Sequence, residues 1–234
     1  MRVTIAEVVV ARFPGAVLGV CVARGIDNRG GDAIVSARLR EAEAGIPARF
    51  EGQLPSEHPN VAVWREAYRA FGAKPKEHRS SVESLVRRVL KGQSIPSVNR
   101  LVDIYNAVSL ETLLPAGAED LDVLEGDLEL TIASGEEPPV RLLGEPEARS
   151  PRAGEVIHRD RVGIVCRRWN WKEADRSKLT ERTRNAVAVV EGLPPIEPSA
   201  VVEAIEEIAR RTRTHCGGAV TTAILDRLRP SAEL

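Results

Sequence analysis

The segment with the clearest chemical character lies at residues 167–172, where aromatic rings alternate with cationic side chains. It holds two of the three tryptophans of the chain, and its residues are Arg167, Arg168, Trp169, Asn170, Trp171 and Lys172. Tryptophan faces can stack on bases while arginine and lysine contact phosphates, so this composition suits the binding of a single-stranded nucleic-acid end. The same residues also suit a sheet edge that two tryptophans close, with an arginine stacked outside them.

A second candidate group follows a helical spacing. Asn99, Asp103 and Asn106 are separated by four and then three positions, which places them on one stripe of the helix expected over residues 97–106. Tyr105 falls on the apolar face of the same helix. The polar stripe is either an exposed face or a set of hydrogen-bonding groups that lines a cavity, and the spacing leaves both open.

Several common catalytic and ligand-binding patterns do not occur. The sequence has no GxxxxGK[ST], no GxGxxG after a strand, no GxSxG and no HExxH. Its four histidines are isolated, and its three cysteines form no CxxC, so we expect no metal site, no cofactor and no disulfide framework. Cys166 lies in an apolar pattern beside two arginines and is expected to be buried and inert.

The composition is that of a globular protein, with 43% hydrophobic and 29% charged residues among 234. No apolar run approaches the roughly 18 residues of a membrane helix, and the first residues do not resemble a signal peptide, so we expect a soluble cytoplasmic protein with no membrane partner. The net charge of −1 hides an uneven distribution, because residues 119–147 carry ten acidic residues and one arginine, whereas residues 159–184 carry nine basic and four acidic ones. The basic segment either attracts a polyanion or pairs with the acidic segment.

The elements that position these residues can be predicted from periodicity and turn signals. A strand–turn–strand is expected over residues 3–22, and further strands over residues 127–132, 155–158 and 162–166. Helices are expected over residues 32–48, 61–71, 182–191, 199–213 and 218–228, and over residues 80–92 behind a capping box of Ser80 and Glu83. These elements indicate one main domain at residues 1–196, with helices around a β core, and a C-terminal helical extension at residues 197–234.

Four motifs occur in one order along the chain: SSVESLVRRVLKG, IPSVNRLVDIYNAVSLETLLPAGAEDLDVLEG, GEVIHRD and VCRRWNWK. Together they resemble the freestanding relatives of the editing domain of the phenylalanyl-tRNA synthetase β-subunit, the B-three/four tRNA-binding domain, over about residues 61–191. The resemblance implies an α+β fold with a core of packed sheets and an amino-acid-sized pocket. It also implies a trans-editing aminoacyl-tRNA deacylase that uses water as the nucleophile, with the 3′ aminoacyl end of a tRNA, and not DNA, as its partner. The alternative is a non-catalytic module that binds tRNA or an amino acid.

The resemblance also suggests site residues. Asn106 and Asp103 match the helix motif of the family, and Pro115 and Asp120 match its following turn. Tyr105 stands where the synthetase has threonine, and Gly117 where it has histidine, so tyrosine specificity is not transferred and a reshaped pocket is expected. The candidates for catalysis are Asn106, Asp103 and Gly117, and the candidates for the pocket are Asn99, Tyr105, Ser109, Pro115, Ala116, Ala118 and Glu136. The segment from Arg167 to Lys172 is expected to receive the terminal phosphates and bases of the tRNA.

Overall fold

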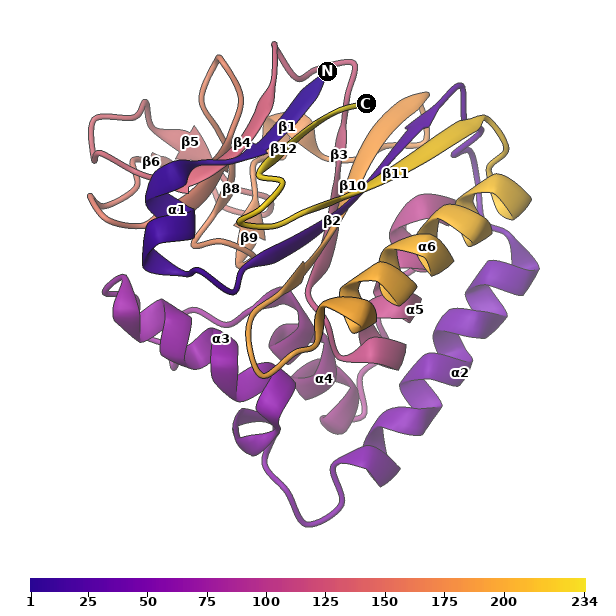
Figure 1. The fold of residues 1–234 in the computed structure, drawn as a ribbon. Coiled ribbons are helices and arrows are strands. Elements are labelled where there is room, and N and C mark those ends of the chain that lie inside the picture. Colours follow the sequence, from indigo (N-terminus) through magenta and orange to yellow (C-terminus); the bar gives the residue numbers. More distant parts are fainter.

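A computed structural model describes residues 1–234 and contains two main sheets and six α-helices (Figure 1). The six-stranded sheet has the order β12 (Ser231–Glu233), β1 (Arg2–Ile5), β4 (Leu128–Ile132), β7 (Val156–Arg159), β8 (Ile164–Arg167) and β9 (Lys172–Glu173). The four-stranded sheet has the order β11 (Ala219–Leu225), β2 (Val17–Arg24), β10 (Asn185–Gly192) and β3 (Ala116–Asp120), and β5 (Val140–Arg141) pairs with β6 (Ala148–Arg149). The expected α+β class is confirmed.

The helices cover the two sheets. They are α1 (Glu7–Arg12), α2 (Ala33–Arg49), α3 (Pro59–Ala70), α4 (Ser81–Leu90), α5 (Arg100–Thr112) and α6 (Pro198–His215). Helices α2, α5 and α6 gather on one side of the four-stranded sheet (Figure 1), and their apolar side chains share a core with it. Helices α1 and α3 contribute to a second core with the six-stranded sheet. None of the six helices combines the length and the apolar composition that a membrane span requires.

Strand β10 shows how the layers are separated. Ala188 and Val190 point to the core shared with α5 and α6, whereas Val187 and Val189 point to the core shared with the six-stranded sheet. Successive side chains of a strand point to opposite faces, so the four-stranded sheet has helices on one face and the other sheet on its second face. A side chain on α5 is therefore separated from the space between the sheets by the four-stranded sheet.

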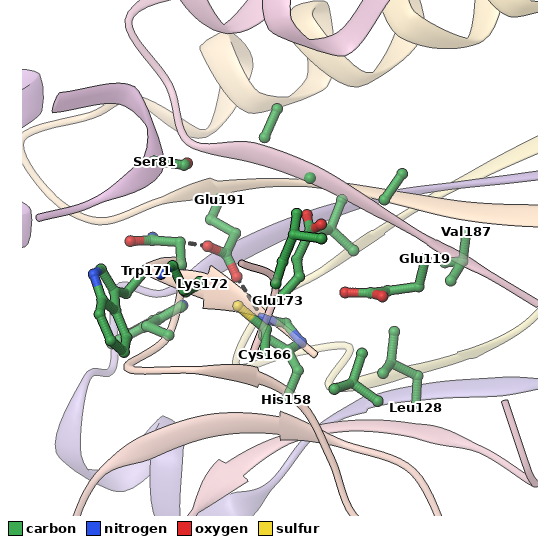
Figure 2. Close-up of a pocket in the computed structure, with 18 residues that line it drawn as sticks. Ser81, Glu119, Leu128, His158, Cys166, Trp171, Lys172, Glu173, Val187 and Glu191 are labelled. Carbon is green, nitrogen blue, oxygen red and sulfur yellow. Dashed lines mark hydrogen bonds and ion pairs between the residues drawn. The ribbon is translucent and has the colours of Figure 1, made fainter. Parts of the chain in front are cut away.

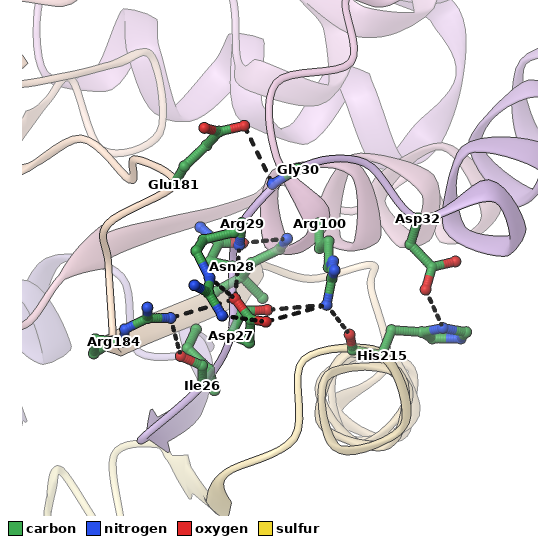
Figure 3. Close-up of polar contacts among 11 residues, drawn as sticks. Ile26, Asp27, Asn28, Arg29, Gly30, Asp32, Arg100, Glu181, Arg184 and His215 are labelled. Atoms are coloured by element: carbon green, nitrogen blue, oxygen red, sulfur yellow. Dashed lines mark hydrogen bonds and ion pairs between the residues drawn. The ribbon is translucent and has the colours of Figure 1, made fainter.

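A polar network beyond the end of β2 connects the starts of α2 and α5 to the end of α6 (Figure 3). The carboxylate of Asp27 accepts a hydrogen bond from Arg184 at 3.3 Å, and Arg100 donates to the backbone carbonyl of His215 at 3.1 Å. Asp32 caps α2 and contacts Nδ1 of His215 at 3.2 Å. The network thus ties the starts of α2, α5 and β10 to the end of α6.

Two predicted helices are wrong, because both segments are strands. Residues 182–191 lie largely in β10, which pairs with β2 on one side and β3 on the other. Residues 218–228 contain β11, which pairs with β2. Strand β10 is largely buried on both faces, so its apolar run is continuous instead of alternating and is easily taken for a helix. Strand β11 is instead an edge strand that is mostly exposed or half-buried. The expected helical extension at residues 197–234 therefore contains one helix, α6, and two strands, β11 and β12.

The helices predicted near residues 32–48, 61–71, 80–92, 97–106 and 199–213 are confirmed. The capping box is only half formed: the Ser80 hydroxyl accepts from the Glu83 amide at 3.4 Å, but the Glu83 carboxylate contacts Arg65 at 2.9 Å and Arg87 at 2.7 Å. The predicted first strand–turn–strand is interrupted, because residues 7–12 form α1 between β1 and β2.

Candidate functional site

A cavity of about 190 Å³ lies between the two sheets and opens beside the segment that carries Trp169 and Trp171 (Figure 2). A single water needs roughly 10–15 Å³ of such space, so the cavity can hold an amino-acid-sized group. Strands β3 and β10 line it from one sheet, and β4, β7, β8 and β9 line it from the other. Its lining residues are Ser81, Ala116, Gly117, Ala118, Glu119, Leu128, Leu143, His158, Val165, Cys166, Trp169, Asn170, Trp171, Lys172, Glu173, Val187, Val189 and Glu191.

Gly117 lets an acidic side chain approach strand β3 closely. A Cβ atom on Gly117 would lie 2.9 Å from Oε1 of Glu173, which is closer than such atoms normally come. Ala116 and Ala118 flank this position, and all three residues line the cavity. The absence of a side chain at Gly117 thus leaves room for the Glu173 carboxylate.

Two carboxylates in the cavity have no cationic partner. Glu119 is 6% exposed and its Oε2 atom has no hydrogen-bond partner, and neither Glu119 nor Glu173 forms an ion pair. Burial raises the pKa of Glu119 well above its ordinary range, and the charge of Glu173 adds to this effect. Burial also raises the pKa of Glu173 to about 7, against an opposing effect of the Ala118 amide. The surroundings of both carboxylates therefore disfavour their charged forms, and a positive charge placed beside them would counter this effect.

A chain of buried hydrogen bonds forms another wall of the cavity. Nε2 of His158 lies 2.7 Å from Oε1 of Glu191, and the Asn170 amide donates to Oε2 of Glu191 at 2.8 Å. The Tyr68 hydroxyl donates to the Asn170 side-chain oxygen at 3.0 Å. When Glu191 is ionised it accepts both bonds, so the hydrogen of a neutral His158 lies on Nε2 and its Nδ1 can accept a proton.

Cys166 also lines the cavity but remains a thiol. It is 9% exposed, and burial raises its pKa well above the ordinary range, with the charges of Glu173 and Glu119 adding to the effect. The expectation of a buried cysteine is confirmed, and a protonated thiol is a weak nucleophile. Nowhere in the chain do three or more His, Cys, Asp or Glu side chains come together as potential metal ligands.

Some residues of the basic and aromatic segment at 167–172 are packed in the core, and others line the cavity. Arg167 is buried and donates two hydrogen bonds of 2.8 Å to Glu155, so it is not available to a phosphate. Trp169 is 2% exposed and packs edge-on against Phe13 and Trp64. Both features match the interpretation of a closed sheet edge.

Among the remaining members of the segment, Asn170 is buried, whereas Arg168, Trp171 and Lys172 are half-buried. The guanidinium of Arg168 lies 4.4 Å from the centre of the half-buried Trp171 ring, as the sheet-edge interpretation expects. Lys172 pairs with Glu145, and Arg159 with Glu129 at 2.8 Å, so part of the basic segment pairs with the acidic one. Asn170, Trp171 and Lys172 nevertheless line the cavity.

The polar stripe of α5 does not line the cavity. Asn99 caps the helix and accepts from the Val102 amide at 3.0 Å. Asp103 accepts from the Val98 amide at 3.1 Å and from the Ser97 hydroxyl. These bonds hold the start of α5 and the loop before it, so the stripe has a structural explanation.

The other α5 candidates also lie apart from the cavity. Tyr105 is buried in the core between the helices and the four-stranded sheet, and the Ser109 hydroxyl donates to the Leu114 carbonyl at 2.6 Å. Asn106 is half-buried on the same helix and is not among the lining residues. The four-stranded sheet separates α5 from the space between the sheets, and this topology could not be derived from the helical spacing.

The two remaining pocket candidates are also outside the lining. Pro115 is buried immediately before β3, where its carbonyl accepts from the Glu191 amide at 3.1 Å. Glu136 is exposed in the turn after β4. The acidic residues that do line the cavity, Glu119, Glu173 and Glu191, were missed, although a glutamate inside an apolar run such as AVAVVEG is a signal for a buried carboxylate.

Comparison with known proteins identifies the family. The family model described as "B3/4 domain" matches residues 63–217, which is more than half of the chain. The chain belongs to the B3/4 domain family. A solved structure similar to this B3/4 domain is an N-terminal fragment of the phenylalanyl-tRNA synthetase β-subunit from Pyrococcus horikoshii, with 12% identity and a TM-score of 0.48. The similarity covers 93% of this chain and 49% of that one, so the chain spans about half the length of the fragment. No curated protein matches the chain.

Proposed function

We propose that this B3/4 domain binds the 3′ aminoacyl end of a tRNA and hydrolyses the ester of a mischarged aminoacyl-tRNA. Family membership supports a tRNA-related role, in line with the motifs that resemble the synthetase editing domain. The observation that carries the proposal is the pair of carboxylates without an ion-pair partner, Glu119 and Glu173, in an amino-acid-sized cavity with largely apolar walls; Oε2 of Glu119 also has no hydrogen-bond partner.

The cavity can recognise both parts of an aminoacyl group. The α-ammonium group binds at Glu119 and Glu173, where its positive charge offsets the effects that raise the pKa of the two carboxylates. The amino-acid side chain lies against apolar residues such as Leu128, Val165 and Val187. A ligand without an ammonium group would leave the carboxylates without a partner, which makes this pair the main source of selectivity.

The hydrolytic step needs a positioned water more than a strong protein nucleophile, because an aminoacyl ester is already activated. In the proposed step His158 takes a proton from water at Nδ1 while the water oxygen bonds to the ester carbon, and Glu191 holds the ring through Nε2. The bond from that carbon to the ribose oxygen then breaks, and the proton passes from His158 to this oxygen. The products are the free amino acid and the uncharged tRNA.

The proposal is tested with a panel of tRNAs, each charged with a different amino acid, and protein well below the substrate concentration. We expect multiple-turnover ester loss from one or a few members, and loss of this activity in Glu173→Gln. Glu136→Gln, which makes the same chemical change at an exposed position, serves as the matched control and should retain activity. Binding of tRNA without turnover would favour the non-catalytic module. The absence of both binding and turnover would refute the proposal.

A further inference from the structure

A second, smaller cavity lies beside the first, on the far side of the segment that carries Arg168 and Trp171. It measures about 50 Å³ and is lined by residues 71–74, 77 and 78 together with Arg152, Glu155 and Arg168. We propose that this cavity is a phosphate-binding subsite. Its assignment to the phosphodiester nearest the 3′ end of a tRNA rests on the proposed function, whereas its affinity for phosphate does not.

The surroundings of the second cavity hold more positive than negative charge. Among the charged residues that line it, Lys74 pairs with Glu77 at 3.2 Å. The Glu155 carboxylate is shared by Arg168, at 3.8 Å, and by the adjoining Arg167, at 2.8 Å. Two arginines thus share one carboxylate and Arg152 has none, which leaves a local surplus of positive charge that attracts an anion.

Polar atoms in this region also lack hydrogen-bond partners. Nη1 of Arg168 and Nδ1 of His78 are buried without a hydrogen bond, and both residues line the cavity. Arg152 is exposed, lines the cavity and forms no ion pair. A buried guanidinium with an unused N–H is costly unless an anion accepts from it, and phosphate oxygens are suitable acceptors. Burial also lowers the pKa of Arg168, as expected for a charge that its neighbours compensate incompletely.

Trp171 connects the two cavities. Its ring lines the first cavity, and it contacts the Arg168 guanidinium at 4.4 Å and the His78 ring at 4.6 Å, both of which line the second. An aminoacyl group in the first cavity and a phosphate in the second would therefore be separated by about the width of one aromatic side chain. This arrangement fits a terminal nucleoside, whose 3′ side carries the ester and whose 5′ side carries the phosphodiester.

The subsite is tested by calorimetric titration of the full chain with cytidylyl-adenosine, which has one phosphodiester, and with adenosine, which has none. We expect cytidylyl-adenosine to bind more tightly than adenosine, and Arg152→Ala to weaken cytidylyl-adenosine by about fivefold without changing adenosine, as an exposed charge pair of about 1 kcal/mol gives. Arg182→Ala removes an exposed arginine that lines neither cavity and serves as the matched control. Equal binding of the two ligands, or an unchanged affinity in Arg152→Ala, would overturn the proposal.

Two further measurements separate the possible sources of the phosphate and the two proposals. Inorganic phosphate is titrated in parallel, and if it binds as tightly as cytidylyl-adenosine the assignment to an RNA end is overturned. None of these ligands carries an amino acid, so the titrations give the same answer whether or not the protein hydrolyses esters. With charged tRNA as substrate, Arg152→Ala should raise KM about fivefold and leave kcat unchanged, and a fall in kcat alone would contradict a role in phosphate binding.

Discussion

Replacing Glu173 by glutamine removes one of the two carboxylates that the empty cavity holds without an ion-pair partner. The pKa of Glu173 rises from an ordinary 4.5 to about 7 in the folded protein. The folded state therefore binds this proton more tightly than the unfolded state between pH 4.5 and 7, and the free energy of unfolding falls as the pH rises through this window. At about 1.4 kcal/mol for each pH unit, the carboxylate destabilises the fold above pH 7 by at most about 3 kcal/mol relative to pH 4.5.

Glutamine keeps the shape of the side chain but cannot ionise, so Glu173→Gln should be more stable than the wild type by about 1–3 kcal/mol at pH 8. At pH 4.5 the two proteins should differ little. The assay is urea denaturation at pH 4.5, 5.5, 6.5 and 8, with Glu136→Gln as a control whose stability should follow the wild type throughout. A stability difference that is constant with pH, or that grows as the pH falls, would refute the pKa assignment.

Three further substitutions test the cavity, a buried ion pair and the polar stripe of α5. Gly117→Ala should push the Glu173 carboxylate out of place, because the new Cβ would lie 2.9 Å from Oε1, and should lower deacylation by about tenfold or more in single-turnover assays; activity equal to wild type would contradict the geometry. Arg167→Ala should lower the free energy of unfolding by about 3–5 kcal/mol, because Glu155 is left buried without its two-bond partner, and a loss below about 1 kcal/mol in urea denaturation would contradict this role. Asn106→Ala should leave the rate of deacylation within about twofold of the wild type, because Asn106 does not line the cavity, and a large loss would return it to the site.

Much of the helical structure could be predicted from the sequence, because its signals are local. Ser80 and Asp32 precede helices that they cap, and the face of α3 that carries Trp64 and Tyr68 has helical periodicity. Strand β10 was harder to predict, since a strand between two neighbours and two packed layers has no polar face to reveal its period. Strand β11 lies at the edge of its sheet, and its run AVTTAIL does not alternate regularly between apolar and polar residues.

The site was less predictable than the fold for a topological reason. Asn99, Asp103 and Asn106 have the spacing of a polar helix face, but spacing does not show which layer of the fold the helix joins. Conversely, Glu119 and Glu173 are 54 positions apart and meet only because β3 and β9 belong to different sheets that pack together. Gly117 could be identified only through the resemblance, which aligns it with a histidine of the synthetase, whereas the cavity-lining part of the tryptophan segment could be identified because an Arg–Trp run is unusual in itself.

The measurement that tests the central claim most directly compares two ligands that differ only at the α-amino group. Amide-linked analogues of 3′-aminoacyl-adenosine, made with a free or an acetylated α-amino group for a range of side chains, are titrated into the wild type and into a Glu119→Gln, Glu173→Gln double variant. The account predicts that at least one free-amine analogue binds the wild type about tenfold more tightly than its acetylated partner, and that the double variant loses this difference. Equal binding of free and acetylated analogues by the wild type, or a preference that persists in the double variant, would contradict recognition of the aminoacyl group by the two carboxylates.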